Sequence, residues 1–298
     1  MASQGFGCMG FSAFYSSSRR VSEEDKIKTF RHVVSKGVTL FNTATFYGPL
    51  HKDGFGTNLR FIRSALEGID RSKIQIMVKI GMDTKAEVDK QGTRWFLSGK
   101  EEFLLADLDY ALQELGTDCI DIAVICRVPT DVSAVELGTT LAKFVQSGKC
   151  KYVGLSEASA DYIRQVHVIH PVYCIEQEYS LWSRDIEEEI IPTCRELGIK
   201  IMAYSPLGRG ALTGTISGKN DEKLDPYDYR VLASPKFSEE NYKNNLTLIE
   251  EAKKLAEKND ITVGQLSLAW LHSKGNDIIP IPGTTSIGKT QILLFIKK

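Results

Sequence analysis

Residues 37–48 read Gly37-Val38-Thr39-Leu40-Phe41-Asn42-Thr43-Ala44-Thr45-Phe46-Tyr47-Gly48. The β-branched and apolar run over 37–41 predicts a short buried strand. Asn42 then lies at the carboxyl end of that strand, and Tyr47 lies in the loop that follows. A second strand is predicted over residues 74–80, with Lys79 at its end. The two predicted strand ends therefore carry a tyrosine and a lysine.

A tyrosine beside a lysine is a candidate proton donor. A tyrosine acts as a general acid only when something lowers its phenol pKa from about 10. A nearby ammonium favours the phenolate, so we expect Lys79 to lower the pKa of Tyr47. The alternative is that Tyr47 is a loop aromatic and Lys79 a solvated strand end. These two segments alone do not decide between the two interpretations.

Outside this stretch, predicted strands and helices alternate along the chain. After the glycine-punctuated start at 5–10, strands are predicted at 37–41, 74–80, 119–125, 151–156, 172–177, 199–204 and 277–281. Helices are predicted at 21–36, 57–68, 101–115, 134–147, 159–169, 185–197, 239–258 and 262–274. Continuous apolar strands with helical crossovers indicate a parallel sheet that is buried on both faces. Eight such units predict an α/β fold, a (β/α)8 TIM barrel.

The barrel is expected to form a single domain over residues 1–298, since no linker or repeat divides the chain. No G-x-G-x-x-G stretch lies between a strand and a helix, which argues against a doubly wound dinucleotide-binding fold. The segment 208–238 is rich in Gly, Asp, Lys and Tyr and is too long for a plain connection. We expect it to form a loop over the barrel mouth.

The composition excludes several classes of function. The 37 basic and 38 acidic residues give a net charge of −1, so no nucleic-acid partner is expected. Six cysteines without a CxxC pair are expected to be reduced core residues, and five histidines without HxxxH or HExxH spacing predict no metal site. No signal peptide and no apolar run of membrane-spanning length is present. We expect a cytoplasmic monomer or small homo-oligomer that contacts no membrane.

Active-site groups of such barrels gather at the carboxyl ends of the strands. Besides Tyr47 and Lys79, the chain places polar or special residues at these ends: Cys126 with Arg127, Ser156 with Glu157, Gln177, residues 204–208, and residues 282–285. A buried glutamine needs a partner, and the amide of Gln177 could bind the carboxamide of a nicotinamide. A hydrogen bond to a neighbouring loop is the alternative for Gln177. Residues 282–285 resemble a turn that offers N–H and hydroxyl donors to a phosphate.

The chain resembles an aldo-keto reductase over residues 5–285. The matching stretches, in the order of the family, are residues 7–10, 42–48, 78–79, 115–121, 154–159, 178–185, 203–210 and 279–284. The resemblance implies a (β/α)8 barrel that binds NADPH and reduces aldehydes and ketones to alcohols. The expected substrate is therefore a small carbonyl compound.

The resemblance also implies a catalytic group of four residues, which in the family are Asp, Tyr, Lys and His. Tyr47 and Lys79 match the tyrosine that protonates the carbonyl oxygen and the lysine that assists it. Asn42 replaces the aspartate, and Cys126 replaces the histidine that orients the carbonyl. An asparagine accepts a hydrogen bond from Lys79 but brings no charge, and a thiol is a weak donor. Two of the four positions thus depart from the family pattern.

The resemblance implies the cofactor contacts as well. Ser156 and Gln177 match residues that contact the nicotinamide carboxamide, and Tyr204 matches the aromatic residue that stacks on the nicotinamide ring. The positions that match the loop over the pyrophosphate are Ser205, Leu207, Gly208 and Arg209, and those that match the 2′-phosphate region are Gly283, Thr284 and Thr285. The family usually continues with a basic residue and a Glu-Asn pair, whereas this chain continues with 286–298, where Lys289 is the candidate phosphate-binding base.

The departures at Asn42 and Cys126 resemble the yeast-type pyridoxal reductase branch, which reduces pyridoxal to pyridoxine with NADPH. The alternative is a catalytically impaired aldo-keto reductase that acts as an NADPH-binding regulatory subunit. A redox sensor centred on Cys126 is a third interpretation, and it requires an exposed thiol of lowered pKa. Retention of both Tyr47 and Lys79 favours the enzyme.

Overall fold

The computed structural model describes residues 4–49, 52–83, 95–214, 216, 218 and 220–293. Residues 215, 217 and 219 of the 208–238 segment, and the last five residues of the 286–298 run, lie outside the described part. Eight strands form one parallel sheet, in the order β1 (Phe6–Gly7), β2 (Leu40–Ala44), β3 (Gln75–Ile80), β6 (Ile120–Ile125), β7 (Cys150–Ser156), β8 (Cys174–Glu178), β9 (Lys200–Tyr204) and β10 (Ile278–Pro280). Two further strands, β4 (Met82–Asp83) and β5 (Phe96–Leu97), form an antiparallel pair.

The sheet closes on itself between β1 and β10. The Gly5 N–H donates to the Pro280 carbonyl, and the Gly7 N–H donates to the Pro282 carbonyl, each at 2.9 Å. A Cβ on Gly7 would lie 2.9 Å from the Ile281 carbonyl oxygen, so glycine is required for this close approach. The closed sheet confirms the predicted (β/α)8 TIM barrel.

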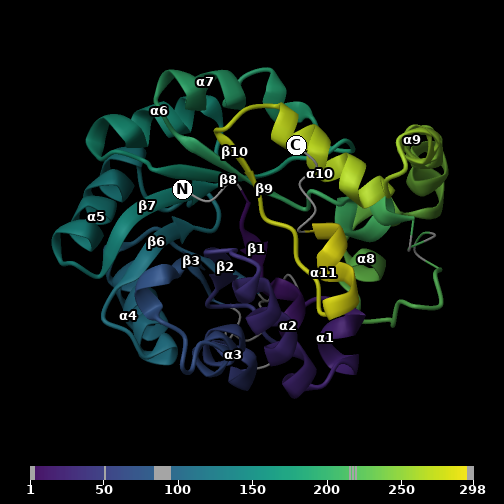
Figure 1. Cartoon of the computed structure of the whole chain (residues 1–298). Helices are drawn as coiled ribbons and strands as arrows, with labels where there is room; N and C mark the ends of the chain where they lie inside the picture. The colour runs from purple at the N-terminus through teal and green to yellow at the C-terminus, as the bar shows by residue number, and fades with distance from the viewer. Residues whose placement is uncertain are drawn as a thin grey trace.

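Helices surround the barrel, with the N-terminal α2 beside the C-terminal α11 (Figure 1). The α-helices are α1 (Ser16–Arg20), α2 (Glu23–Ser35), α3 (Thr57–Ala65), α4 (Glu101–Leu115), α5 (Ala134–Gln146), α6 (Ala160–Ile169), α7 (Ile190–Glu196), α8 (Tyr229–Leu232), α9 (Glu239–Lys258), α10 (Val263–Ser273) and α11 (Ile287–Leu293). Local signals set several of their ends: Ser22 caps α2, and Ser133 and Thr262 form capping boxes at α5 and α10.

Three element predictions needed correction. The strand predicted over 37–41 is β2 at Leu40–Ala44, so Asn42 lies within the strand. The helix predicted over 185–197 is a 3-10 turn at Asp185–Glu187 followed by α7 from Ile190. Pro192 explains the late start, because proline is tolerated in the first turn of a helix but not further inside it. The last barrel strand, expected to have no helix after it, is followed by α11.

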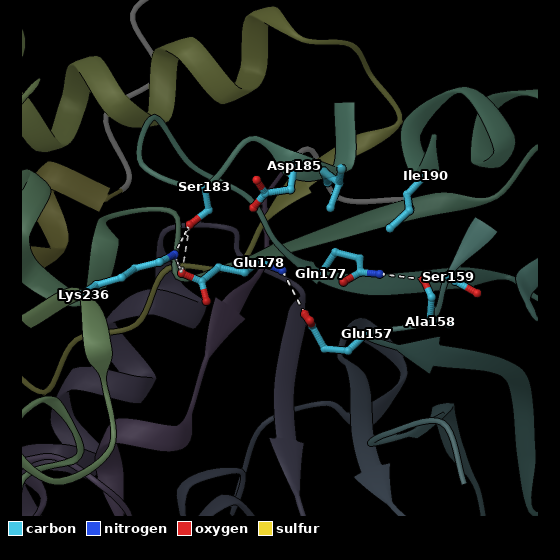
Figure 2. A pocket seen from close by; sticks show the side chains of 10 residues that line it. Glu157, Ala158, Ser159, Gln177, Glu178, Ser183, Asp185, Ile190 and Lys236 are labelled. Atoms are coloured by element: carbon cyan, nitrogen blue, oxygen red, sulfur yellow. Dashed lines mark hydrogen bonds and ion pairs between the residues drawn. The ribbon is translucent and has the colours of Figure 1, made fainter. Parts of the chain in front are cut away.

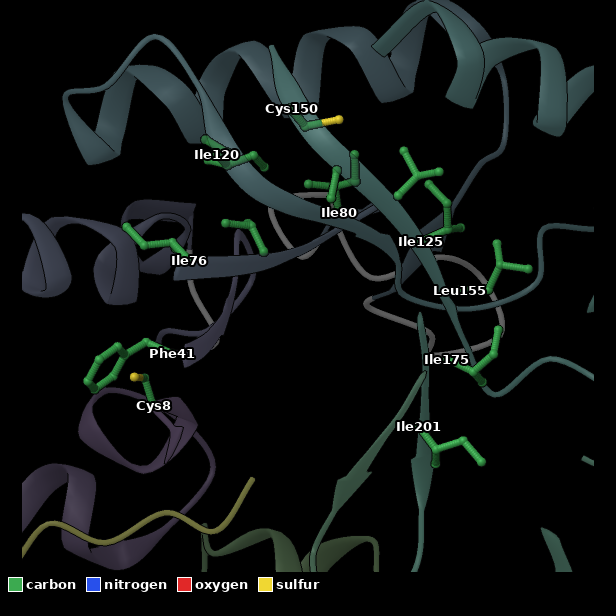
Figure 3. Packing of buried hydrophobic residues seen from close by; sticks show 14 of the residues in the cluster. Cys8, Phe41, Ile76, Ile80, Ile120, Ile125, Cys150, Leu155, Ile175 and Ile201 are labelled. Atoms are coloured by element: carbon green, nitrogen blue, oxygen red, sulfur yellow. The ribbon is translucent and has the colours of Figure 1, made fainter. Parts of the chain in front are cut away.

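Two layers of apolar side chains hold the barrel. Phe41, Ile76, Ile125, Leu155 and Ile175 point away from the barrel axis toward the helices (Figure 3). A second cluster lies inside the barrel and consists of Leu40, Met77, Ile122, Val124, Cys174, Met202, Ile279 and Ile281. Because side chains alternate along a strand, the residues two positions after Leu40, Met77 and Cys174 also point inward. The interior cluster is therefore the floor on which the next inward layer rests.

The 208–238 segment bonds to the loop and helix after β1. The Asp228 carboxylate is fully buried and accepts hydrogen bonds from the Ser16 N–H and hydroxyl at 2.7 and 2.8 Å. The same carboxylate pairs with Arg230, and the Tyr229 N–H donates to the Phe14 carbonyl at 2.8 Å. These contacts place α8 close to α1, at the edge of the barrel (Figure 1).

None of the described helices is both long enough and apolar enough to cross a membrane.

Candidate active site

Strand alternation brings a layer of polar residues together above the apolar interior cluster. Asn42 follows Leu40 by two positions, Lys79 follows Met77, and Glu176 follows Cys174. Ser156 and Tyr204 share this inward direction on β7 and β9, two positions after Gly154 and Met202. The predicted Asn42 and Lys79 are therefore joined by a carboxylate that the sequence analysis did not select.

Asn42, Lys79 and Glu176 form a closed ring of hydrogen bonds, and each is only 3% exposed. The Lys79 ammonium donates to Glu176 Oε1 at 2.9 Å and to Asn42 Oδ1 at 3.0 Å. The Asn42 amide donates to Glu176 Oε2 at 2.9 Å. Burial alone would lower the pKa of Lys79, but the Glu176 carboxylate raises it above its ordinary range. The lysine is thus held as a cation.

Tyr47 lies beside this ring, with the Lys79 Nζ 4.7 Å from the centroid of the phenol ring. Burial raises the pKa of Tyr47 to about 12, while the Lys79 charge acts in the opposite direction. The expected net lowering of the Tyr47 pKa was therefore wrong for the protein alone. The phenol is protonated at neutral pH, and the Lys79 charge lowers its pKa below the value that burial alone would give.

A second set of contacts fixes the strand ends that carry Tyr47 and Lys79. The buried Asp107 carboxylate of α4 accepts hydrogen bonds from the Gly81 N–H at 2.8 Å and the Thr45 hydroxyl at 3.2 Å. The Ser12 hydroxyl donates to the Tyr47 carbonyl at 2.9 Å. One carboxylate therefore ties the end of β3 to the end of β2.

Cys126 lies at the end of β6 in the same buried cluster as Tyr47. The thiol is 2% exposed, and burial raises its pKa to about 11. A buried neutral thiol lacks the properties of a redox sensor. The neighbouring Arg127 is exposed, and its Nη1 lies 2.6 Å from the Cys126 carbonyl oxygen and 3.7 Å from the sulfur.

Gln177 is not brought to the site. Because Glu176 points into the barrel, the next side chain on β8 points outward, where the Gln177 amide donates to the Ala158 carbonyl at 3.0 Å (Figure 2). The hydrogen bond to a neighbouring loop, which was the alternative for Gln177, is therefore the arrangement that the structure shows. Gln177 lines an open pocket of about 440 Å³ together with Glu157, Glu178, Ser183 and Lys236.

Ser156 and Tyr204 fit the nicotinamide end of a cofactor. The Ser156 side chain is 1% exposed, and its hydroxyl has no hydrogen-bond partner among the described residues. A buried hydroxyl without a partner is rare and indicates an external group that completes it. The Tyr204 ring is half-buried and packs against the interior cluster, so one of its faces rests on protein. The residues present therefore fit a flat ring that carries a carboxamide.

The loop after β9 turns sharply at three predicted cofactor positions. Ser205, Gly208 and Arg209 all have positive φ, and a Cβ on Gly208 would lie 2.6 Å from the Trp182 ring. The Arg209 guanidinium pairs with Glu178 at 3.3 Å, and Leu207 packs against the main core. The side chains of Arg209 and Leu207 are therefore both held by contacts within the protein.

The predicted 2′-phosphate positions lie between β10 and α11. A Cβ on Gly283 would lie 2.3 Å from the Gly7 carbonyl oxygen, so this glycine is required by packing. Thr284 Oγ1 accepts a hydrogen bond from the Ser286 N–H at 3.2 Å, and the Thr285 carbonyl accepts one from the Thr29 hydroxyl at 3.4 Å. Lys289 is exposed on α11. Their part in phosphate binding stays a prediction.

An aromatic wall, which we define as Phe14, Phe46, Trp95 and Tyr229, stands next to the Tyr47 phenol. Phe14 and Phe46 contact the Tyr47 ring edge to face, at centroid distances of 6.1 and 5.1 Å. Trp95 stacks on Phe14 at 5.9 Å and is 36% exposed. Neither this wall nor Glu176 was predicted from the sequence. Glu176 could have been found, because a carboxylate within a buried strand needs a charged partner. The wall gave no such signal, because its residues lie far apart in the chain.

The comparisons with known proteins agree with this geometry. The sequence model of the Aldo/keto reductase family matches residues 5–295. A Glycine max protein named "Probable aldo-keto reductase 1" is 41% identical over 283 residues, which are 95% of this chain and 77% of the relative. The barrel is similar to a glycerol dehydrogenase from Gluconobacter oxydans, with a TM-score of 0.83, 23% identity, and 99% and 86% of the two chains covered.

A second solved structure shares the fold at lower similarity. It is an aldo/keto reductase from Klebsiella pneumoniae in complex with NADP and acetate, with a TM-score of 0.69, 18% identity, and 99% and 84% of the two chains covered. The match of nearly the whole chain to the family model, with a curated relative of 41% identity, decides the family. The chain belongs to the aldo/keto reductase family of NADP(H)-dependent oxidoreductases, which act on carbonyl and alcohol groups.

Proposed function

We propose that this protein reduces an aldehyde to an alcohol with NADPH, with Tyr47 as the proton donor, and that pyridoxal is its substrate. The observation that carries the proposal is the buried ammonium of Lys79 at 4.7 Å from the Tyr47 ring, at the mouth of the barrel. A cation in this place stabilises the phenolate that remains after proton transfer. It therefore supports the enzyme over a binding protein without turnover.

The residues of the site divide the chemistry between them. NADPH, when bound, supplies a hydride to the carbonyl carbon, and Ser156 and Tyr204 would hold its nicotinamide. The Tyr47 O–H bond breaks as its proton passes to the carbonyl oxygen, which completes the alcohol. Lys79 stabilises the phenolate, and solvent returns the proton. Fixing Lys79 beforehand means that the site does not reorganise as charge develops.

The aromatic wall supports an aromatic aldehyde as substrate. Phe14, Phe46 and Trp95 offer ring faces and edges within the same cluster as the Tyr47 phenol. Flat aromatic substrates gain offset-stacked and edge-to-face contacts with such a wall. Pyridoxal is a flat aromatic aldehyde, and its carbonyl is activated by the ring, so it demands less assistance from the acid.

The cofactor site is tested by Ser156→Ala. We expect NADPH to bind the parent, and the variant to bind it several-fold more weakly, because one hydrogen bond is worth about 1 kcal/mol. Fluorescence titration with NADPH measures both dissociation constants. Ser147→Ala, at the C-terminal end of α5, is the control and should leave NADPH affinity unchanged. Equal affinity in Ser156→Ala and the parent would remove Ser156 from the cofactor site.

The substrate class is tested by a panel of aldehydes. We expect NADPH oxidation to be faster with pyridoxal and other aromatic aldehydes than with aliphatic ones of similar size. Trp95→Ala should lower kcat/KM for the aromatic members by roughly 2- to 10-fold, the value of one aromatic contact, and change the aliphatic ones little. A parent that binds NADPH yet reduces no member of the panel would favour the regulatory subunit instead.

A further inference from the structure

The negative charge beside Lys79 comes from the opposite wall of the barrel. Lys79 lies on β3 and Asn42 on the adjacent β2, whereas Glu176 lies on β8, three strands beyond β3 in the sheet. The ion pair at 2.9 Å therefore crosses the barrel interior, where both side chains are about 4% exposed. The family pattern has an aspartate where this chain has Asn42, and the structure holds a carboxylate at position 176 instead.

The asparagine at position 42 and the glutamate at position 176 depend on each other. The Asn42 side chain accepts a hydrogen bond from Lys79 through its oxygen and donates one to Glu176 through its nitrogen. A carboxylate at 42 could not donate, and it would face a second carboxylate at hydrogen-bond distance. Two such carboxylates cannot both be ionised without a large cost, so one would take up a proton. Asparagine at 42 is thus the residue that matches glutamate at 176.

We propose that Glu176 is the charged positioning residue of this reductase: it replaces the expected aspartate, keeps Lys79 cationic and holds it beside Tyr47. The inference rests on the proposed function, because it assigns a role in proton transfer from Tyr47. A buried ammonium without a carboxylate loses its proton easily, since desolvation favours the neutral amine. Glu176 therefore sets the pH at which the Tyr47–Lys79 pair gives up its first proton.

The other titratable groups around Glu176 do not provide this charge. Cys126 of the β6 end, Cys174 of β8 and Cys8 after β1 have pKa values raised by burial, so they are neutral thiols at physiological pH. Arg127 at the mouth is cationic, as Lys79 is. Tyr47 itself is a protonated phenol. Among these groups Glu176 is the carboxylate that balances the buried ammonium.

The test is a transposition of the charge. Glu176→Gln keeps the size of the side chain and removes its charge, so kcat for aldehyde reduction should fall at least about tenfold, part of the 100- to 10,000-fold typical of acid assistance. The alkaline limb of its pH profile should move to lower pH. Without the Glu176 charge, the Tyr47–Lys79 pair loses its first proton at a lower pH than in the parent. Asn42→Asp alone should also lower kcat. Asn42→Asp combined with Glu176→Gln should recover most of the activity and return the limb toward the parent's position.

Controls separate this inference from the proposed function. Glu196→Gln removes an exposed carboxylate that pairs with Arg164 on the surface and should leave the pH profile unchanged. Glu176→Asp keeps the charge and should keep the limb near that of the parent even if kcat falls. Ultraviolet difference titration of each variant against its Tyr47→Phe counterpart follows tyrosinate formation without turnover. In Glu176→Gln, the tyrosinate titration of Tyr47 should differ from that of the parent, because the charges beside the phenol have changed.

Two results would overturn the role of Glu176 in an active parent. One is a Glu176→Gln variant with the parent's pH profile and tyrosinate titration. The other is a folded, NADPH-binding double variant that recovers no activity over Glu176→Gln. A parent that reduces no carbonyl would instead contradict the proposed function, and the tyrosinate titration would still decide whether Glu176 controls the proton of Tyr47.

Discussion

Replacing Tyr47 by phenylalanine should lower kcat for aldehyde reduction by about 100- to 10,000-fold, the range of general acid catalysis. The hydroxyl that gives its proton is removed, while the ring keeps its contacts with Phe14 and Phe46. Steady-state NADPH oxidation with pyridoxal measures the loss. Fluorescence titration should show that NADPH binds the variant as it binds the parent, because the hydroxyl is assigned to the carbonyl and not to the cofactor.

Tyr173→Phe is the matched control for this variant. Tyr173 lies just before β8, stacked on Tyr152 at the opposite end of the barrel, so its hydroxyl has no place in the reaction. The control should keep the parent's kcat. If Tyr47→Phe retained more than roughly a tenth of the parent's kcat, the donor would be a different group, such as a water molecule.

Replacing Lys79 by methionine should damage both activity and stability. The loss of the cation leaves the Tyr47 phenolate without a counter-charge, so kcat should fall by about 100-fold or more. It also leaves Glu176 as a buried carboxylate without its ion-pair partner, and breaking a buried pair in this way costs about 3–5 kcal/mol. Urea unfolding of the parent and the variant measures the change in the free energy of unfolding.

The double variant Lys79→Met with Glu176→Gln separates the two effects. It removes both charges together, so much of the lost stability should return while the activity stays low. A single Lys79→Met variant that is as stable as the parent would show that the Glu176 carboxylate is solvated or neutral in the folded protein. That result would contradict the ion pair across the barrel.

The barrel, and the strand ends that bring Asn42, Tyr47 and Lys79 together, could be predicted from the sequence because of the pattern of the strands. The runs that end near Asn42 and Lys79 are apolar and continuous, which is the pattern of parallel strands buried on both faces. The same pattern hides which residue of a strand points inward, because apolar side chains occupy both faces. For β8, the pattern did not show whether Glu176 or Gln177 points into the barrel, and the resemblance to the family favoured Gln177.

The direction of the β8 side chains is decided by contacts that the sequence does not display. Cys174 packs in the interior cluster and Ile175 in the outer one, so Glu176 points inward and Gln177 toward Ala158. The aromatic wall was beyond prediction for a related reason. Phe14, Trp95 and Tyr229 lie on three segments far apart in the chain, and the folded barrel brings Trp95 and Tyr229 against Phe14, which contacts the Tyr47 ring.

The closure of the barrel has a consequence for local opening of the fold. The join between β1 and β10 runs through the carbonyls of Pro280 and Pro282, and proline has no N–H to donate in return. In the described part of the chain, the backbone donors across this join are therefore the N–H groups of Gly5 and Gly7, and β1 itself spans Phe6–Gly7. Local unfolding needs less free energy where fewer hydrogen bonds must break. Hydrogen exchange at Gly5 and Gly7 should accordingly be faster than in β3 and β6, and because the Cys8 N–H donates to the Asn42 carbonyl, such opening would reach the strand of the active site first.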